Sequence, residues 1–375
     1  MMFTCAPTCT DPTHRHAAAA TRKTGAKTAS PAAKIVRGRD GRQKRIDIHC
    51  HYLNPEVAKK AAVINPAQQE AAWIFANQHT RDVNVKQMQD RAPKLSSIET
   101  RLKDMDRMGI DIQAVSPAPF QYYYFAEAGF CAELARGVND RIAEIVATWP
   151  DRFVGLGTVP LQNADLAVRE LDRAVKELGL RGVQINTNVN GRNLTDPSLG
   201  LEKFFSRAAE LGIVIFMHPN GFSHADRLTD HYFNNIIGNP LDTTIAVHHL
   251  IFDGVMQRHP KLKIVLAHVG GYIAHYWARM DHAHRARPDT KRVIRKAPSS
   301  YLSRFYFDTI TFDAQMLRHL IDKWGADHVV LGTDYPYDMA DMDPVGSVES
   351  VKRLPRAEKD LIMGGNAARL LKIKL

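Results

Sequence analysis

Short apolar runs alternate with longer amphipathic segments along most of this chain. Eight of the runs have the length of β-strands, and several are continuously apolar, as is typical of parallel strands buried on both faces. Apolar residues at helical spacing lie between them. The predicted strands cover residues 45–51, 112–116, 153–158, 182–185, 214–218, 263–268, 304–308 and 329–334. The predicted helices cover residues 97–108, 130–148, 163–178, 199–211, 241–259 and 313–324.

Eight strand–helix units over about 330 residues predict an α/β fold, a (β/α)8 TIM barrel. The polar, helix-like stretch 55–95 has no strand pattern and predicts an insertion after the first strand. Gly109 and Gly212 are predicted to end two of the helices. An open, doubly wound sheet is the main alternative, but no glycine-rich phosphate loop follows the first strand.

The positive charge of the chain is concentrated at its N-terminus. The formal net charge is +10, but residues 1–45 hold ten Lys or Arg against Asp11 and Asp40, a balance of +8 that leaves +2 for the remaining 330 residues. This stretch is poor in large apolar residues, so we predict a disordered basic tail over 1–44 and one folded domain over 45–375. Because the charge belongs to the tail, we expect the folded domain to bind no nucleic acid.

The four cysteines (Cys5, Cys9, Cys50 and Cys131) form no disulfide pattern, which favours a reducing cytoplasm. No stretch approaches the roughly 20 consecutive apolar residues that a membrane helix requires. The tail also lacks the apolar region of a signal peptide. We therefore expect a cytoplasmic protein with no membrane partner.

Two histidines end the first predicted strand. Successive side chains of a strand point to opposite faces, so His49 and His51 project in the same direction. Imidazole is the commonest side-chain metal ligand, and the pair is therefore a candidate half of a mononuclear metal site. The same alternation directs Cys50 to the opposite face, where we expect it to pack rather than bind metal.

Three further strands end in potential ligands. His218 ends the fifth strand, His268 the sixth and Asp334 the eighth. The active site of a TIM barrel lies at the C-terminal ends of its strands, so these side chains converge if the fold is correct. The sequence therefore predicts a metal centre at that end of the barrel.

The pattern His-x-His, His-Pro, His-x-Gly-Gly and Gly-Thr-Asp-Tyr-Pro resembles the amidohydrolase superfamily, in its decarboxylase branch. The resemblance extends to residues 152–158, 175–179, 182–185, 260–263 and 287–289, and it covers roughly residues 44–372. It implies a metal-dependent, non-oxidative decarboxylase, a carbon–carbon lyase.

The resemblance also implies roles for single residues. His49, His51, His218 and Asp334 match the ligands of one divalent ion, and three imidazoles with one carboxylate suit Zn²⁺, although Mn²⁺ is also compatible. His268 matches the catalytic histidine of the family, which acts as general base and then as proton donor beside a water on the metal. A fifth ligand or a core histidine is the alternative for His268.

Three arginines are candidates for binding a substrate carboxylate, because guanidinium pairs with carboxylates in a bidentate manner. Arg279 matches an arginine that reaches the substrate of the neighbouring subunit in the family, which implies a homodimer. Arg287 lies in the Arg-Pro-Asp match. Arg91, in the insertion, is a candidate clamp within the same subunit.

The chain also departs from the family pattern. Asn220 and Gly221 follow the His-Pro pair where the branch has Trp in a substrate wall, and Val269 replaces the first Gly after the catalytic histidine. Tyr123, in the aromatic stretch 121–125, is a candidate replacement for part of that wall, and Asn220 is a candidate substrate-binding residue. We therefore expect the partner to be a small carboxylic acid, aromatic or muconate-like, that differs from the usual substrate.

Two other functions remain open at this point. The same ligands serve the hydrolysis of an amide or a lactone, in which a metal-activated water attacks a carbonyl group. A non-enzymatic barrel that binds RNA or a protein through its basic tail is the second alternative, and it rests on the tail alone.

Overall fold

The computed structural model describes residues 43–373. The predictions for the basic tail, including Cys5 and Cys9, fall almost entirely outside these residues. Eight strands form one parallel sheet in the order β1-β2-β3-β4-β7-β8-β9-β10, and β5 and β6 form a separate antiparallel pair. The strands are β1 Ile46–Tyr52, β2 Ile112–Pro117, β3 Phe153–Gly157, β4 Gly182–Ile185, β5 Asn188–Val189, β6 Arg192–Asn193, β7 Val214–Met217, β8 Lys263–Leu266, β9 Tyr306–Asp308 and β10 Val329–Val330.

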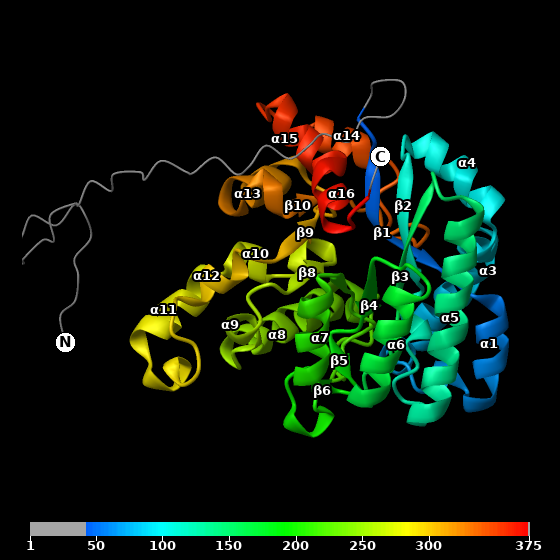
Figure 1. The fold of residues 1–375 in the computed structure, drawn as a ribbon, viewed down its shortest axis with the longest axis horizontal. Helices are drawn as coiled ribbons and strands as arrows, with labels where there is room; N and C mark the ends of the chain where they lie inside the picture. The colour runs from blue at the N-terminus through cyan, green and yellow to red at the C-terminus, as the bar shows by residue number, and fades with distance from the viewer. Residues whose placement is uncertain (1–42, 374–375) are drawn as a thin grey trace, which may run out of the picture. The chain divides into compact units, whose positions relative to one another are not determined.

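Backbone hydrogen bonds join the first strand to the segment that follows the last. The amide of Ile48 donates to the carbonyl of Leu331 (2.9 Å), and that of His51 donates to the carbonyl of Tyr335 (2.8 Å). Cys50 and Tyr335 form a parallel bridge. These bonds close the sheet into a barrel with helices between its strands (Figure 1), which confirms the predicted (β/α)8 fold and excludes the open sheet.

Helices follow most strands and lie outside the barrel (Figure 1). Gly109 and Gly212 end α4 and α7 with positive φ angles, as predicted. The predicted helix 241–259 is instead two helices, because the chain turns at Gly254, where φ is 82°. The helices are α1 Pro55–Ala61, α2 Ala71–Ile74, α3 Gln78–Ser96, α4 Ile98–Met108, α5 Ala128–Thr148, α6 Ala164–Lys176, α7 Glu202–Leu211, α8 Asn239–Phe252, α9 Val255–Arg258, α10 Ile273–Tyr276, α11 Ala278–Ala286, α12 Pro298–Leu302, α13 Ala314–Trp324, α14 Pro344–Glu349, α15 Arg356–Asp360 and α16 Asn366–Leu370.

The barrel interior is filled by apolar side chains from six of the eight strands, including Ile48 of β1 and Phe216 of β7. Residues of α16 belong to the same cluster, and α16 packs on β1 and β10. The C-terminal helix therefore helps to fill the barrel, and the polar residues gather at the strand ends.

The register between β1 and β2 shifts between Asp47 and Cys50, as in a β-bulge. Ile48 lies in the interior cluster, and His49, the next residue, contacts the Phe216 ring in the same interior (centroids 4.9 Å apart). A bulge inserts one residue and redirects the side chains that follow it. Cys50 is buried in the layer between strands and helices, as expected for a packing residue.

The insertion 55–95 forms α1, α2 and most of α3, with no strand, as its pattern predicted. Two short 3-10 turns lie between α1 and α2. In the part of the chain that the structure describes, no helix is long and apolar enough to cross a membrane.

Gly182, the first residue of β4, lies where two neighbouring barrel strands approach each other closely. A Cβ atom there would lie 2.2 Å from the Val214 carbonyl oxygen of the neighbouring strand. We expect Gly182→Ala to lower the free energy of unfolding by about 1–3 kcal/mol, because the backbone must shift. Urea unfolding measures this. Gly129→Ala is the matched control, since only the Glu127 carboxylate lies near; an equal loss there would contradict the explanation.

Candidate metal centre

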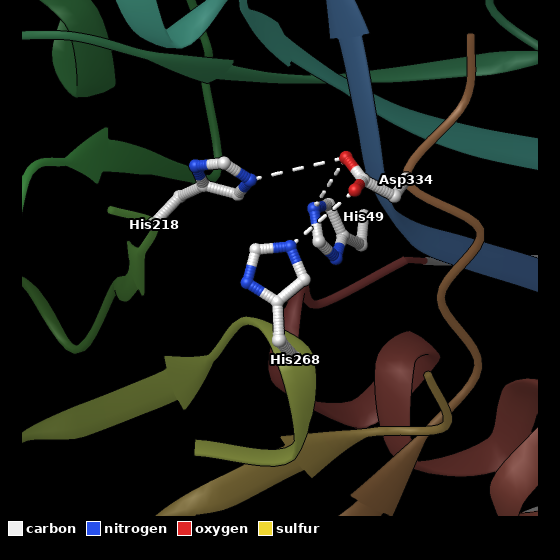
Figure 2. Close-up of side chains that lie close together, drawn as sticks. All are labelled: His49, His218, His268 and Asp334. Atoms are coloured by element: carbon white, nitrogen blue, oxygen red, sulfur yellow. Dashed lines mark hydrogen bonds and ion pairs between the residues drawn. The ribbon is translucent and has the colours of Figure 1, made fainter. Parts of the chain in front are cut away.

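The Asp334 carboxylate is surrounded by histidines from three strand ends. Three imidazoles face its Oδ1 atom, and the distances from Nε2 are 3.2 Å for His49, 3.1 Å for His51 and 3.8 Å for His218. Nε2 of His268 instead lies 3.3 Å from Oδ2. Figure 2 shows His49, His218 and His268 pointing at the carboxylate. The structure thus brings together all five residues predicted to form the site.

The tautomer of His51 indicates that this cluster can hold a cation. Its Nδ1 atom lies 3.1 Å from the Pro117 carbonyl oxygen, which can only accept, so Nδ1 carries the hydrogen. Burial lowers the pKa of His51 to about 4, so the ring is neutral and its Nε2 lone pair faces Asp334. A lone pair and a carboxylate oxygen at this distance require a cation beside them.

His218 supports the same conclusion. Neither of its ring nitrogens has a hydrogen-bond partner among the described residues, although both are buried. Burial lowers the pKa of His218 well below its usual value, so the ring is neutral. Buried polar atoms are rarely left without a partner, and neutral imidazoles beside a carboxylate suit a divalent metal.

A second carboxylate lies behind the histidines. Asp308, at the end of β9, accepts a hydrogen bond from His49 Nδ1 (2.7 Å) and from the backbone amides of His268 and Val269 (2.8 Å each). Burial alone lowers the pKa of His49, but Asp334 and Asp308 raise it to about 10. Asp308 therefore orients the ring so that Nε2 faces the centre, the arrangement typical of metal-binding histidines.

The same electrostatics act on Asp334. Burial alone raises the pKa of this carboxyl group, but the imidazoles, His49 above all, hold it well below its usual value. Asp334 is therefore ionised and can bind a cation. The donors of His49, His218, His268 and Asp334 all lie within 4.8 Å of one another, with His51 beside them.

Three residues of the centre have left-handed backbone conformations. The φ angles are 52° for His268, 61° for Val269 and 60° for Asp334. Such conformations cost about 1–3 kcal/mol at a non-glycine residue and persist only where the surroundings impose them. Val269 thus adopts the conformation that glycine favours at the position where the family pattern has one. The strand predicted over 329–334 ends at Val330 in the structure.

A cavity of ≈ 540 Å³ opens onto the centre. His218, His268 and Asp334 line it together with apolar residues of the insertion. Two of the predicted substrate-binding residues, Arg91 and Asn220, also line it. Tyr123 instead lines a smaller neighbouring cavity of ≈ 280 Å³.

The other two predicted substrate-binding residues lie elsewhere in the single chain. Arg279 and Arg287 are exposed, on or just after α11, and line neither cavity. Arg287 pairs with Asp289 in its own loop (2.9 Å). Substrate binding by both arginines therefore stays a prediction.

Sequence reasoning missed several buried polar residues around the centre. Asp47 accepts hydrogen bonds from the His49 amide (3.0 Å) and the Thr333 hydroxyl (2.7 Å). Arg101, fully buried, binds the His51 carbonyl. Asp308 could have been predicted as a residue of the centre, because it too ends a predicted strand.

Comparison with known proteins agrees with this geometry. The Amidohydrolase family model matches residues 46–373. The 2-amino-3-carboxymuconate-6-semialdehyde decarboxylase of Dictyostelium discoideum is 33% identical, over 88% of this chain and 92% of the relative. The crystal structure of 5-carboxyvanillate decarboxylase from Sphingomonas paucimobilis has a TM-score of 0.78 at 29% identity, over 88% of this chain and 99% of that one.

A dihydroxybenzoic acid decarboxylase from Polaromonas sp. JS666, crystallised with bound manganese and the inhibitor 2-nitroresorcinol, has a TM-score of 0.74. It is 26% identical and covers 88% of this chain and 97% of its own. The resemblance read from the strand-end motifs is thus confirmed. The match over the whole barrel and the identity to the Dictyostelium enzyme show that this chain belongs to the amidohydrolase family.

Proposed function

We propose that this protein is a metal-dependent, non-oxidative decarboxylase of a carboxylated aromatic or muconate-like acid. The observation that carries the proposal is the arrangement of three histidines on one oxygen of Asp334 and His268 on the other, at a largely apolar cavity. The related proteins named above are decarboxylases of such acids, which supports this reaction over others of the family.

His49, His51, His218 and Asp334 are the proposed ligands of one divalent ion. Their ligand atoms share one region around Oδ1, whereas His268 faces Oδ2. Three imidazoles and a carboxylate suit Zn²⁺, and the manganese in the Polaromonas neighbour makes Mn²⁺ the alternative. When bound, the ion supplies Lewis-acid polarisation of substrate oxygens.

His268 is the proposed acid–base residue. Its side chain is 20% exposed and lines the cavity, whereas His49 and His51 are fully buried. Its Nε2 atom lies 3.3 Å from Asp334 Oδ2. Decarboxylation breaks the bond between the ring carbon and the carboxylate, releases CO2 and leaves an electron pair on that carbon. His268 supplies the proton that this carbon takes up.

Arg91 and Asn220 are the proposed substrate-binding residues within the subunit, since both line the cavity. Arg91 offers a bidentate partner for a carboxylate. Tyr123 is assigned to the smaller cavity, as a wall residue for a substituent that extends there.

We also propose a homodimer in which Arg279, and with it Arg287, reaches the neighbouring active site. Apolar side chains are exposed close to Arg279 in the chain, with Tyr272 at 43% and Tyr276 at 66% exposure, and Ile236 at 50% contributes a further exposed apolar side chain. Tyr272 donates a hydrogen bond to the Ile237 carbonyl (3.3 Å), so Tyr272 lies next to the segment that contains Ile236. Exposed apolar patches mark interaction sites. The free, buried Cys50 and Cys131 support the proposed cytoplasmic location.

The ligand assignment predicts the metal content of the purified protein. We expect about one divalent ion per chain in the wild type and its loss in His218→Ala, because the variant would lack one of the four proposed protein ligands. Elemental analysis measures this. His249→Ala, on the exposed end of α8, is the control and should keep its ion. Full metal content in His218→Ala would show that the ligand set is wrong.

The reaction predicts CO2 release from at least one acid in a panel of carboxylated phenols and muconates. His268→Ala should lower kcat by about 10²–10⁴-fold, the usual contribution of an acid–base residue, while the metal content stays unchanged. A CO2 assay and elemental analysis of the same sample measure both. Ring opening of lactones without CO2 release from any acid would identify a hydrolase instead. Loss of metal from His268→Ala would make His268 a ligand.

The proposed dimer predicts a KM effect from an exposed residue. Arg279→Ala should elute as a dimer but raise KM about tenfold or more, since a charge-assisted hydrogen bond to the substrate is lost. Size-exclusion chromatography with light scattering and steady-state kinetics measure the two effects. Arg285→Ala, on the same helix, is the matched control. A monomeric wild type, or an unchanged KM in Arg279→Ala, would contradict the prediction.

A further inference from the structure

Glu70 is a partly buried carboxyl group in the active-site cavity that the proposed chemistry does not use. It immediately precedes α2 in the insertion. Its Oε2 atom accepts a hydrogen bond from the Asn220 side chain, which lies two residues after His218. The insertion and the end of β7 are therefore joined at this pair, close in sequence to a proposed metal ligand.

The pair lies where two cavities meet. Glu70, Phe75, Asn220 and Gly221 line both the larger cavity at the metal centre and the smaller one beside Tyr123. Gly221 has a φ of 77°, and a Cβ atom on it would lie 2.5 Å from the Ala72 amide nitrogen. The absence of a side chain thus lets α2 rest directly on the loop after β7, which keeps Glu70 against Asn220.

The hydrogen bonding gives the two oxygens of Glu70 different roles. The Asn220 amide can only donate through Nδ2, so Oε2 is an acceptor. No described residue donates a side-chain hydrogen bond to Oε1, which is left for a ligand in the cavity. Burial raises the pKa of Glu70 to about 8, although the bond from Asn220 opposes this. A protonated carboxyl group accepts through one oxygen and donates through the other.

The groups that face Glu70 are compatible with a protonated, uncharged carboxyl group. Tyr122 and Tyr123 lie near enough to interact with it electrostatically, and burial raises the pKa of both hydroxyls, so they are uncharged at neutral pH. Asn220 is uncharged. Arg91 lines the same cavity and offers the positive charge for a carboxylate. A neutral Glu70 adds a donor to this cavity without repelling an anion.

We propose that Glu70, held in place by Asn220, is a specificity-determining residue that donates a hydrogen bond to a second carboxylate of the substrate. The substrate class is therefore a dicarboxylic aromatic or muconate-like acid, with one carboxylate at the metal centre and the other at Glu70. This inference rests on the proposed function, which it narrows. It also gives a physical role to Asn220, which stands where the family pattern has Trp.

Equilibrium binding tests the inference without turnover. We would measure the affinities of benzoate, benzene-1,3-dicarboxylate and benzene-1,4-dicarboxylate by calorimetry on the metal-loaded enzyme. The wild type should bind at least one diacid more tightly than benzoate. Glu70→Ala should reduce that preference about tenfold, whereas Glu70→Gln should keep it, because the amide also accepts from Asn220 and donates into the cavity. Gln68→Ala, an exposed neighbour, is the matched control and should keep the preference.

The pH dependence provides a second readout on a variant that keeps the shape of the side chain. Glu70 is protonated below a pKa of about 8 and ionised above it. The preference of the wild type for the diacid should therefore fall as the pH rises through about 8, and that of Glu70→Gln should not. The comparison cancels any titration at the metal centre, and it decides the matter alone if Glu70→Ala does not fold.

Each alternative result overturns the assignment. The role of Glu70 would be rejected if the wild type showed no preference for either diacid, or if Glu70→Ala kept the full preference. It would also be rejected if Glu70→Gln lost the preference, or if the pH profiles of the wild type and Glu70→Gln were parallel. Failure to release CO2 from any acid, with these binding ratios as expected, would instead reject the decarboxylase and leave Glu70 as a binding residue. The two failures are thus distinguishable.

Discussion

The centre depends on one electrostatic constraint, an ionised carboxylate buried among imidazoles at the mouth of a barrel. Asp334 is ionised because its surroundings favour the charge, yet His51 and His218 bring lone pairs and not protons. Two unprotonated nitrogens beside a buried carboxylate favour a cation at this position, since a buried charge needs a partner. The arrangement of the protein atoms is therefore suited to a divalent cation.

The barrel maintains this arrangement through groups that never touch the metal. Asp308 fixes His49 and the turn at His268, and Asp47 joins β1 to Thr333. The β-bulge in β1 allows Ile48 to fill the interior while His49 enters the centre. In metalloenzymes, such supporting contacts commonly fix the positions and orientations of the side chains that bind the metal.

The strands, the barrel and the five central residues could be predicted from the sequence, because apolar runs are local and parallel strand ends meet at one edge. The bulge could not, since nothing in the pattern of residues 45–51 distinguishes a shifted register from a regular one. Glu70 could not be found either. The insertion 55–95 has no strand periodicity, so its position over the cavity depends on the tertiary contact at Gly221. The substrate-binding role of Arg279 and Arg287 was predicted from the resemblance alone. Neither arginine lines either of the two cavities within one subunit, so the contacts of a single chain do not account for that role.

The closure of the barrel places the centre at the seam between the two ends of the domain. His49 and His51 come from the first strand, Asp334 follows the last, and the amide of Asp334 donates to the His49 carbonyl (2.8 Å). A bound ion therefore cross-links residues 285 positions apart in the chain. Ligands that bind only the native state stabilise it, and a link across so long a loop removes much of the freedom of the unfolded chain. A metal bound at this centre would therefore hold the first and last strands together and stabilise the native fold in addition to its proposed role in catalysis.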